Sequence, residues 1–398
     1  MKAAPRLNPV ATIAVAQLMG TSLWFSANGA ADDLRRAWGV GVTDIGTLTS
    51  AVQIGFILGT LGFALSGLAD RFPASKIFAV CALLGAAFNA GFAWLASGIA
   101  SGAVFRFCVG ICLAGIYPIG MKLVVSWSPQ RTGSALAYLV GMLTLGTALP
   151  HALRAIGGTW KWQYVIASSS VLAVLAAVLI FALGDGPHLA LRKHSQGSMK
   201  GVFGAFASPA FRAAALGYFG HMWEVYTFWT IVPLLIVRTA LNAGLQGTSV
   251  SGLAFAIIAA GAVGSVAGGV LSHKVGSRAV AATALATSGL CCLIFASGWQ
   301  WFAPVGLLVL FLVWGAAVVA DSPQFSALSA RACPADLVGG ALAIQISIGF
   351  AITVVSIALI TTLFTRMGTG VAWLLLPGPV LGLLGFYPEL RIAPNVAR

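Results

Sequence analysis

Long uncharged apolar runs constrain this chain more than any other feature of its sequence. The runs are about 20 residues long, the length that a helix needs to cross the hydrocarbon core of a bilayer, and they lack the alternation of barrel strands. Because lipid offers no hydrogen bonds to the backbone, each run must satisfy its own N–H and C=O groups as a helix. Only 8% of the residues are charged, against about 25% in soluble domains. The sequence therefore predicts an all-α membrane protein with many spans.

Polar breaks separate twelve of these runs. The longest polar interruption covers 184–210 and divides the runs six and six. We therefore expect an N-terminal six-helix bundle over 1–183, a linker over 184–210 and a C-terminal six-helix bundle over 211–398. The expected spans are 9–28, 44–66, 77–97, 101–124, 133–153, 162–183, 211–237, 249–271, 279–298, 303–326, 340–364 and 371–387.

The basic residues give an orientation. If the N-terminus is cytoplasmic, 15 of the 22 Lys and Arg residues fall in inner segments and 6 in outer segments, with Arg106 inside a span. This asymmetry agrees with the positive-inside rule and predicts an inner-membrane protein with both termini in the cytoplasm. Orientation thus explains the formal charge of +13, and no basic tract remains to suggest a nucleic-acid partner.

No enzyme chemistry stands out in the sequence. A Walker-type Gly-rich loop, a cluster of metal ligands and a catalytic constellation are all missing from the pattern, so we expect no ATP drive, no cofactor and no metal. The six cysteines are interpreted as small buried hydrophobic residues, not as a disulfide framework. We expect a monomer whose partners are the lipid bilayer, a small solute and protons.

The two halves of the chain are similar to each other. Pro118 and Pro323 begin matching Pro/Gly patterns, and the segment 66–76 has a counterpart at 268–278. Both matches are offset by about 205 residues, the six-helix period of transporters that rock around a site near the membrane midplane. Gly55, Gly59 and the glycines of 261–268 sit at helical spacing in apolar runs, which predicts close helix packing.

Two motifs resemble the major facilitator superfamily. The run Leu68-Ala69-Asp70-Arg71, with Lys76 just beyond, matches that family's loop between its second and third helices, although Ser66 and Pro73 to Ser75 depart from the pattern. Arg106 and Gly110 match its Arg-x-x-x-Gly signature in the fourth helix. The resemblance covers essentially the whole chain and implies twelve helices in two pseudo-symmetric bundles.

The same resemblance implies a cytoplasmic gate and suggests a branch. Asp70 and Arg71, with Lys76 and Arg131, would hold the cytoplasmic side shut, and Lys122 or Arg131 would supply the base for Asp70. The segments 23–28, 221–229 and 320–328 resemble a bacterial branch grouped loosely with nitrate/nitrite porters. Those porters hold nitrate with arginines in helices 2 and 8, and the corresponding runs here contain none, so nitrate is disfavoured.

Ionisable side chains inside a membrane cost about 2.5–3.5 kcal/mol each on insertion scales, so each one is informative. Arg106 is expected either to bind an anionic group or control a proton site, or to pair structurally within its own half. Glu224 and His221 lie three residues apart and share a helix face. Apolar surroundings disfavour the charged form of a carboxyl group, so Glu224 is suited to exchanging protons. The alternative is a neutral Glu224 bonded to a neighbour such as His221.

Other polar residues in the spans extend this expected pathway. Gln17, Thr21, Trp24 and Asn28 form a stripe along the first expected helix, and Gln53 and Gln345 are candidates to join it, although interhelical hydrogen bonding is an equal alternative. Tyr117 follows Arg106 on the same expected face. Asp321 is interpreted as a second proton site or, preferably, as a structural partner of a base such as Lys122.

These observations predict a proton-coupled secondary transporter that moves a small organic anion by alternating access. Two alternatives remain open. Glu224 and nearby aromatic residues would also suit an exporter of hydrophobic or cationic compounds, and the same fold could serve a membrane receptor or scaffold that does not transport.

Overall fold

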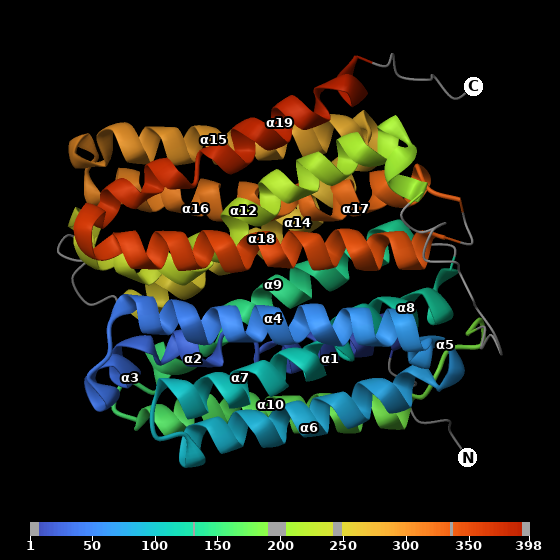
Figure 1. Ribbon diagram of the computed structural model, residues 1–398, viewed down its shortest axis with the longest axis horizontal. Coiled ribbons are helices and arrows are strands. Elements are labelled where there is room, and N and C mark those ends of the chain that lie inside the picture. Colours follow the sequence, from blue (N-terminus) through green and yellow to red (C-terminus); the bar gives the residue numbers. More distant parts are fainter. Residues whose placement is uncertain (1–7, 130–131, 190–203, 242–248, 335–336, 392–398) are drawn as a thin grey trace. The chain divides into compact units, whose positions relative to one another are not determined.

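The computed structural model describes residues 8–129, 132–189, 204–241, 249–334 and 337–391, and all the regular elements in these ranges are helices. The chain packs into two compact units. The first contains Met1–Ser195 with Ser251–Ile258, and the second contains Gln196–Val250 with Ala259–Arg398. Figure 1 labels the helices of both units.

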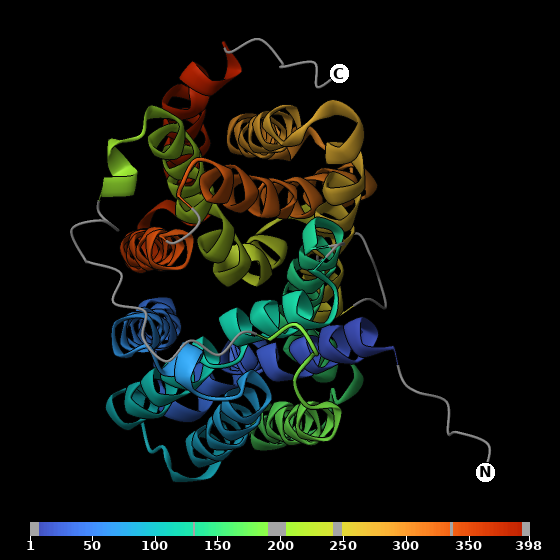
Figure 2. The ribbon, with the colours of Figure 1, turned by 90° about the vertical axis from the view of Figure 1, so that its right-hand side faces the viewer.

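The helices of the first unit follow one another along the chain and lie side by side within it (Figures 1 and 2). They are α1 (Pro9–Thr21), α2 (Ser26–Gly29), α3 (Ala31–Trp38), α4 (Val42–Ser66), α5 (Leu68–Arg71), α6 (Ala74–Leu95), α7 (Ile99–Ala114), α8 (Tyr117–Trp127), α9 (Thr132–Ile156) and α10 (Trp162–Leu183).

The second unit is also built from helices. Its elements are η2 (Ala205–Ala207), α12 (Pro209–Arg238), most of α14 (Val250–Val275), α15 (Ser277–Gly298), η3 (Trp299–Trp301), α16 (Pro304–Ala320), α17 (Ser322–Arg331), α18 (Val338–Met367), η4 (Gly368–Leu374) and α19 (Pro377–Leu390).

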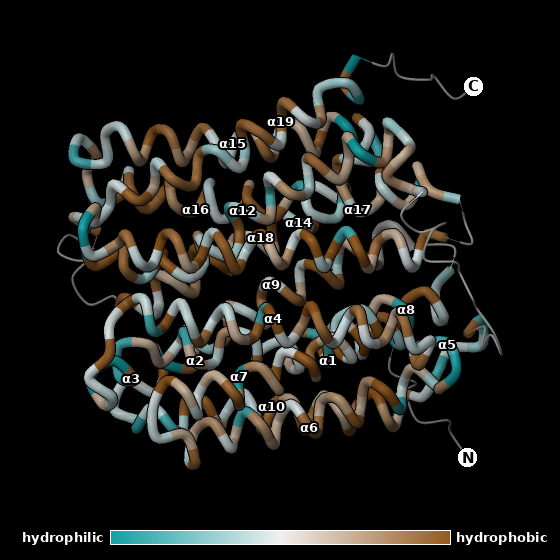
Figure 3. Tube along the Cα trace, in the orientation of Figure 1, coloured by the Kyte–Doolittle hydropathy of each residue, from teal (hydrophilic) through white to brown (hydrophobic). Residues whose placement is uncertain are grey.

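Helix length and hydropathy confirm the membrane fold. Nine helical stretches in the described residues are long and apolar enough to cross a membrane. One of them, Val338–Leu390, has 53 residues and contains two helices, α18 and α19, so it is long enough for two passes. The other two expected spans, 211–237 and 9–28, fall on α12 and on the α1–α2 pair, which are not among these nine stretches. Hydrophobic residues prevail along the long helices, and hydrophilic residues gather at short elements such as α3 and α5 (Figure 3).

Four spans that the sequence predicted as single helices are each divided in two, and one of them, 371–387, is divided between η4 and α19. The spans over 101–124 and 303–326 break before Pro118 and Pro323, which lie at the second positions of α8 and α17. Proline has no N–H to continue the hydrogen-bond ladder, so these breaks have a local cause. The span over 9–28 breaks at residues 22–25 without a proline. Its cause is tertiary and involves Arg106, as described below.

Glycines allow α4 and α7 to pack with their backbones in contact. A Cβ atom at Gly55 would lie 2.0 Å from the Phe107 carbonyl oxygen, and one at Gly110 would lie 2.1 Å from the Val52 carbonyl oxygen. The second unit has the same device, because a Cβ at Gly264 would lie 2.0 Å from the Ala316 carbonyl oxygen. The packing role predicted for the small residues is confirmed at these positions.

This packing can be tested with two matched substitutions in α4. Gly55→Ala places a methyl group where the backbone of α7 already lies, so we expect overpacking to cost about 1–3 kcal/mol. Gly62→Ala adds the same methyl group where nothing lies within 4 Å, and it should be neutral or gain up to about 1 kcal/mol of helix propensity. Thermal unfolding of the purified variants measures both effects. Equal melting temperatures for the two variants would contradict the close contact.

Candidate functional site

Arg106 on α7 is fully buried and bonds to the broken start of the chain's first span. One terminal nitrogen, Nη1, donates to the Leu23 carbonyl oxygen at 3.0 Å, to Ser26 Oγ at 2.9 Å and to Asn89 Oδ1 at 3.1 Å. The other, Nη2, donates to the Trp24 carbonyl oxygen. The guanidinium group therefore binds the carbonyls of Leu23 and Trp24, where the helix is interrupted, and replaces donors that a continuous helix would supply.

Asn89 on α6 extends this network across the first unit. Its side-chain nitrogen donates to the Ile166 carbonyl oxygen and to Ser170 Oγ, both on α10 and both at 2.9 Å. Its oxygen accepts from Ser26 Oγ at 2.6 Å as well as from Arg106. Arg106 thus links the turn at residues 22–25, α2 and α6 and, through Asn89, α10. This arrangement favours the structural alternative for Arg106, as a pairing within its own half.

The positive charge of Arg106 nevertheless has no acidic partner among the described residues. All four of its hydrogen-bond partners are neutral, and its Nε makes no hydrogen bond to the described part of the chain. The ring of Phe92 lies 5.8 Å from the guanidinium carbon and adds a cation–π contact. A positive charge that is bonded but not neutralised raises the potential inside the first unit and favours an anion nearby.

The polar stripe predicted for the first span is buried, but the break divides it between α1 and the residues after it. Trp24 donates its indole N–H to Gln53 Oε1 at 3.0 Å, and the Asn28 amide donates to Thr49 Oγ1 at 2.9 Å. Two side-chain amides keep atoms without a hydrogen-bond partner among the described residues. They are the amide nitrogen of Gln53 and both polar atoms of Gln17.

Aromatic rings lie beside this part of the stripe. The Phe56 ring packs 4.8 Å from Trp24 and stacks 6.5 Å from Tyr117. In the first unit, the three aromatic residues therefore lie on the turn after α1, on α4 and on α8. The two amides with unpaired atoms, Gln17 and Gln53, lie on α1 and α4. In the second unit the Gln345 side-chain oxygen is also buried without a partner in the described residues.

Glu224 on α12 is fully buried and bonded through both carboxylate oxygens. Trp314 Nε1 of α16 donates to Oε1 at 2.6 Å, and Ser288 Oγ of α15 donates to Oε2 at 2.9 Å. The Trp314 ring stacks on Phe228 with centroids 4.4 Å apart. The structure thus gives Glu224 partners on two other helices, and not His221 as the sequence alternative suggested.

His221 points instead to the junction between α16 and α17. Its Nδ1 lies 2.8 Å from Asp321 Oδ1, and the two side chains are 3% and 0% exposed. The sequence interpretation preferred a structural partnership of Asp321 with a base such as Lys122; the base beside Asp321 is His221, and Lys122 pairs with Asp70. The second unit therefore buries two carboxyl groups and one imidazole within three helical segments.

Asp70 has a base at the position where the resemblance placed a gate. Lys122 Nζ lies 2.9 Å from Asp70 Oδ1 and also donates to the Ala69 carbonyl oxygen. Lys122 is one of the two candidate bases, and the other, Arg131, lies outside the described residues. Arg71 and Lys76 are exposed and form no ion pair with the described part of the chain.

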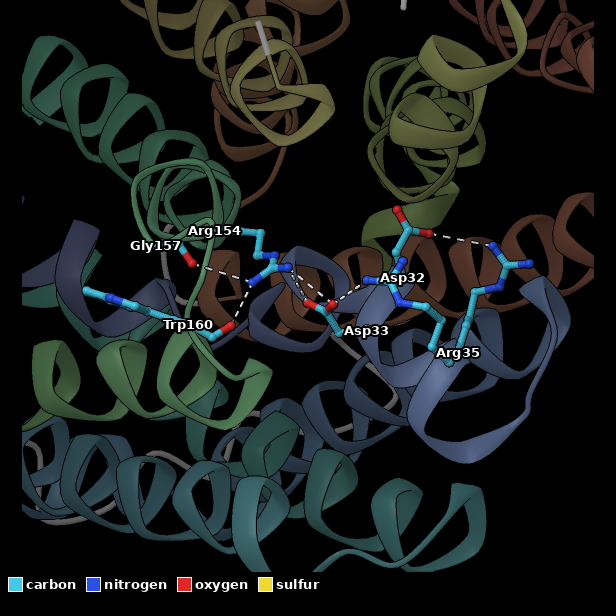
Figure 4. A network of polar contacts seen from close by, with 7 residues as sticks. Asp32, Asp33, Arg35, Arg154, Gly157 and Trp160 are labelled. Atoms are coloured by element: carbon cyan, nitrogen blue, oxygen red, sulfur yellow. Dashed lines mark hydrogen bonds and ion pairs between the residues drawn. The ribbon is translucent and has the colours of Figure 1, made fainter. Parts of the chain in front are cut away.

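A second ionic network, around α3 and the loop between α9 and α10, was not predicted (Figure 4). Arg154 of α9 lies 2.9 Å from Asp33 Oδ2 of α3 and also donates to the Trp160 carbonyl oxygen at 2.9 Å. Arg36 binds the same carboxylate, and Arg35 lies 3.6 Å from Asp32. These contacts fasten α3 to the loop between α9 and α10.

Sequence reasoning found the buried charges and missed most of their partners. Asn89, Ser288 and Trp314 hold Arg106 and Glu224 in place, yet none of the three was singled out. An asparagine in the middle of an apolar span was a usable signal, because unpaired amides are costly in a membrane. Ser288 and Trp314 gave no such signal, since serine and tryptophan are common in membrane helices.

Comparisons with known proteins agree with this architecture. The sequence profile of the Major Facilitator Superfamily matches residues 13–214. A 3-(3-hydroxy-phenyl)propionate transporter of Escherichia coli is 27% identical over 279 residues, which are 69% of this chain and 66% of that protein. A 4-hydroxybenzoate transporter of Pseudomonas putida is 28% identical over 154 residues, which are 37% of this chain and 33% of that protein. This chain thus covers less than two thirds of either relative.

A solved structure shows the same fold over nearly the whole chain. The crystal structure of the nucleoside transporter NupG superposes with a TM-score of 0.75 and covers 96% of this chain and 100% of its own. The two sequences are only 13% identical, so this similarity concerns the fold alone.

Proposed function

This chain belongs to the major facilitator superfamily, and on that premise we propose that it is a secondary active transporter of a small organic acid. The proposal rests mainly on the relatives, because two of them are named as transporters of hydroxylated aromatic acids. The charge of Arg106, which has no acidic partner among the described residues, supports an anionic solute because it raises the electrostatic potential inside the first unit. The solute crosses by alternating access of the two units.

Coupling to protons is the second part of the proposal. The buried groups Glu224, His221 and Asp321 supply proton-binding atoms inside the second unit. Two buried carboxyl groups close to one imidazole exchange protons as a coupled set, and no enzyme chemistry is involved. The solute pathway has a polar and aromatic lining, contributed by Trp24, Asn28, Gln53, Tyr117 and Gln345. The cytoplasmic gate is formed by Asp70 with Lys122. Arg71, Lys76 and Arg131 belong to the same gate.

The setting of the transporter completes the proposal. It acts as a monomer in the inner membrane, with both termini in the cytoplasm and a cytoplasmic linker over 184–210 between bundles 1–183 and 211–398. It belongs with the branch grouped loosely with nitrate/nitrite porters but does not carry nitrate, because α4 and α14 contain no arginine. A cation exporter is disfavoured, since both oxygens of Glu224 are already bonded inside its own unit.

Uptake by purified protein in liposomes tests this function. Labelled 4-hydroxybenzoate should accumulate only when a pH gradient is imposed. A gradient of about 2 pH units supplies about 2.7 kcal/mol per proton, which allows up to about 100-fold accumulation with one proton per solute. Tetraphenylphosphonium, a lipophilic cation, serves as the matched control and should not accumulate. Equal flux of the acid with and without the gradient would contradict proton coupling, and uptake of the cation alone would contradict the substrate class.

A further inference from the structure

Asp321 lies where the helical path of the tenth span is interrupted. α16 ends at Ala320, α17 begins at Ser322, and Pro323 follows at once. The backbone N–H groups of Gln324 and Phe325 both donate to the Asp321 carbonyl oxygen at 3.0 Å, so α17 starts as a regular helix of its own. Because Pro323 removes one bond of the ladder, the chain can bend here at low cost.

Two kinds of contact hold α17 against its neighbours. The first is apolar. A Cβ at Gly217 of α12 would lie 2.2 Å from the Phe325 ring, and that ring packs edge-on against Phe386 of α19 with centroids 5.2 Å apart. The second is polar and lies one turn further along α12, where His221 meets Asp321 at 2.8 Å. The polar contact is therefore at the bend itself.

The charge of this pair depends on a single proton. Among the side chains of the described residues, His221 is the only hydrogen-bonding neighbour of the Asp321 carboxylate, and the backbone N–H groups of Asp321 and Ser322 lie beside it. With one shared proton the pair is neutral overall. Without it, a carboxylate remains buried with no partner of opposite charge, which costs several kcal/mol by desolvation.

Few other titratable groups face the pair. Glu224 lies one turn away on α12 and is held by Ser288 and Trp314, and the Tyr218 ring lies 5.9 Å from the His221 ring. On α15, the thiols of Cys291 and Cys292 neighbour Glu224. The charged groups of the helices packed around the pair are engaged or exposed elsewhere: Arg278 pairs with Glu389, Arg391 lies over Tyr387, and Arg212, Arg238, His273, Lys274, Arg331 and Arg366 are exposed.

We propose that the His221–Asp321 pair is the positioning element that converts proton binding into movement of α17. With the proton bound, the pair holds α17 against α12. When the proton leaves, the bare carboxylate turns towards water, and α17 swings away about the bend at Asp321 to Pro323. This inference rests on the proposed proton-coupled transport and names the residues and the segment through which the coupling acts.

The first unit provides a natural comparison. Its fourth span is also interrupted before a proline, Pro118, and continues as α8. Two residues before that proline stands Ile116, at the position that Asp321 takes before Pro323. Since isoleucine cannot be protonated, the corresponding interruption before α8 has no protonatable side chain at that position, and the ion pair of α8, Lys122 with Asp70, lies further along the helix.

Hydrogen exchange of the full-length protein in lipid nanodiscs tests this directly, with no substrate present. After correction for the chemical exchange rate, we expect protection of residues 322–331 to fall at least about tenfold between about pH 6 and about pH 9. Residues 117–127 should keep the same protection at both values. Equal behaviour of the two segments would overturn the proposal.

Asp321→Asn gives the second arm of the test. An amide has no charge to lose and can still donate to neutral His221, so α17 should stay protected at both pH values. Persistent pH dependence in this variant would also overturn the proposal. If the variant does not fold, the comparison of α17 with α8 in the unmodified protein still decides the question.

The outcomes separate this inference from the proposed function. If α17 does not respond to pH while liposome uptake follows the gradient, the proton acts elsewhere and only this inference fails. If α17 responds while uptake ignores the gradient, the transport proposal fails and the pH-dependent bend stands.

Discussion

Replacing Arg106 by alanine should prevent the first unit from folding stably. Hydrogen bonds with a charged partner contribute about 1.5–3 kcal/mol each, and Arg106 makes four of them to the interrupted start of the first span. Removing a charge from a membrane span is favourable by only about 2.5–3.5 kcal/mol of insertion free energy. The free energy lost with the four hydrogen bonds therefore exceeds the free energy gained by removing the charge by several kcal/mol. We expect the melting temperature to fall by at least about 10 °C.

Two further variants locate the cause of that loss. Arg106→Lys keeps the charge but replaces a planar fork by a single ammonium group, which cannot reach the carbonyls of Leu23 and Trp24 together with Ser26, so it should recover little stability. Arg36→Ala is the control, because Arg36 is 70% exposed and its pairing with Asp33 is expected to contribute about 1 kcal/mol or less. An Arg106→Ala protein that melts normally but no longer binds its solute would show that Arg106 acts as a ligand instead.

Replacing Glu224 by glutamine should leave the fold intact and abolish coupled transport. The amide oxygen can accept from Trp314 Nε1, and the amide nitrogen can donate to Ser288 Oγ, whose own proton then goes to the Leu285 carbonyl oxygen at 3.0 Å. The amide cannot take up or release a proton. We therefore expect accumulation under a gradient of about 2 pH units to fall from up to about 100-fold to none.

Alanine at the same position separates the two roles of Glu224. Glu224→Ala leaves the Trp314 N–H buried and unpaired, which should lower thermal stability by about 1–3 kcal/mol and reduce transport as well. Glutamine should restore the stability and not the coupling. A Glu224→Gln protein that accumulates solute as well as the unmodified protein would exclude Glu224 from the proton pathway.

The sequence was sufficient to predict the all-α membrane fold and the family. These depend on features that are local or repeated: uncharged runs of membrane length, proline and glycine patterns in both halves, and the Asp70-Arg71 motif. The breaks before Pro118 and Pro323 could have been predicted on the same basis, because a proline inside a helix has a known local effect. The structure adds what proline does there, which is to place Asp321 at a bend.

The partners of the buried charges could not be predicted, because they are set by helix packing over long sequence distances. Glu224 meets Ser288 and Trp314, which are 64 and 90 residues away along the chain. Spacing of three residues put His221 and Glu224 on one face, yet each turns to a different neighbour. The break at residues 22–25 is also bonded to a distant residue, since its carbonyls accept from Arg106, more than 80 residues away.

The roles of the remaining pathway residues stay predictions. Trp24, Gln53 and Tyr117 are brought together with Phe56 inside the first unit, which suits an aromatic solute. The gate residues Asp70 and Lys122 are paired as a gate requires. Transport measurements on variants of these residues would establish what each one does.

Proton movement on addition of solute tests the central claim most directly. Liposomes containing the unmodified protein are suspended in weakly buffered medium with no imposed gradient, and 4-hydroxybenzoate is added while a pH electrode records the medium. We predict a pH change whose initial rate follows solute entry, and none with Glu224→Gln. Solute entry at full rate with no pH change in the unmodified protein would contradict the account.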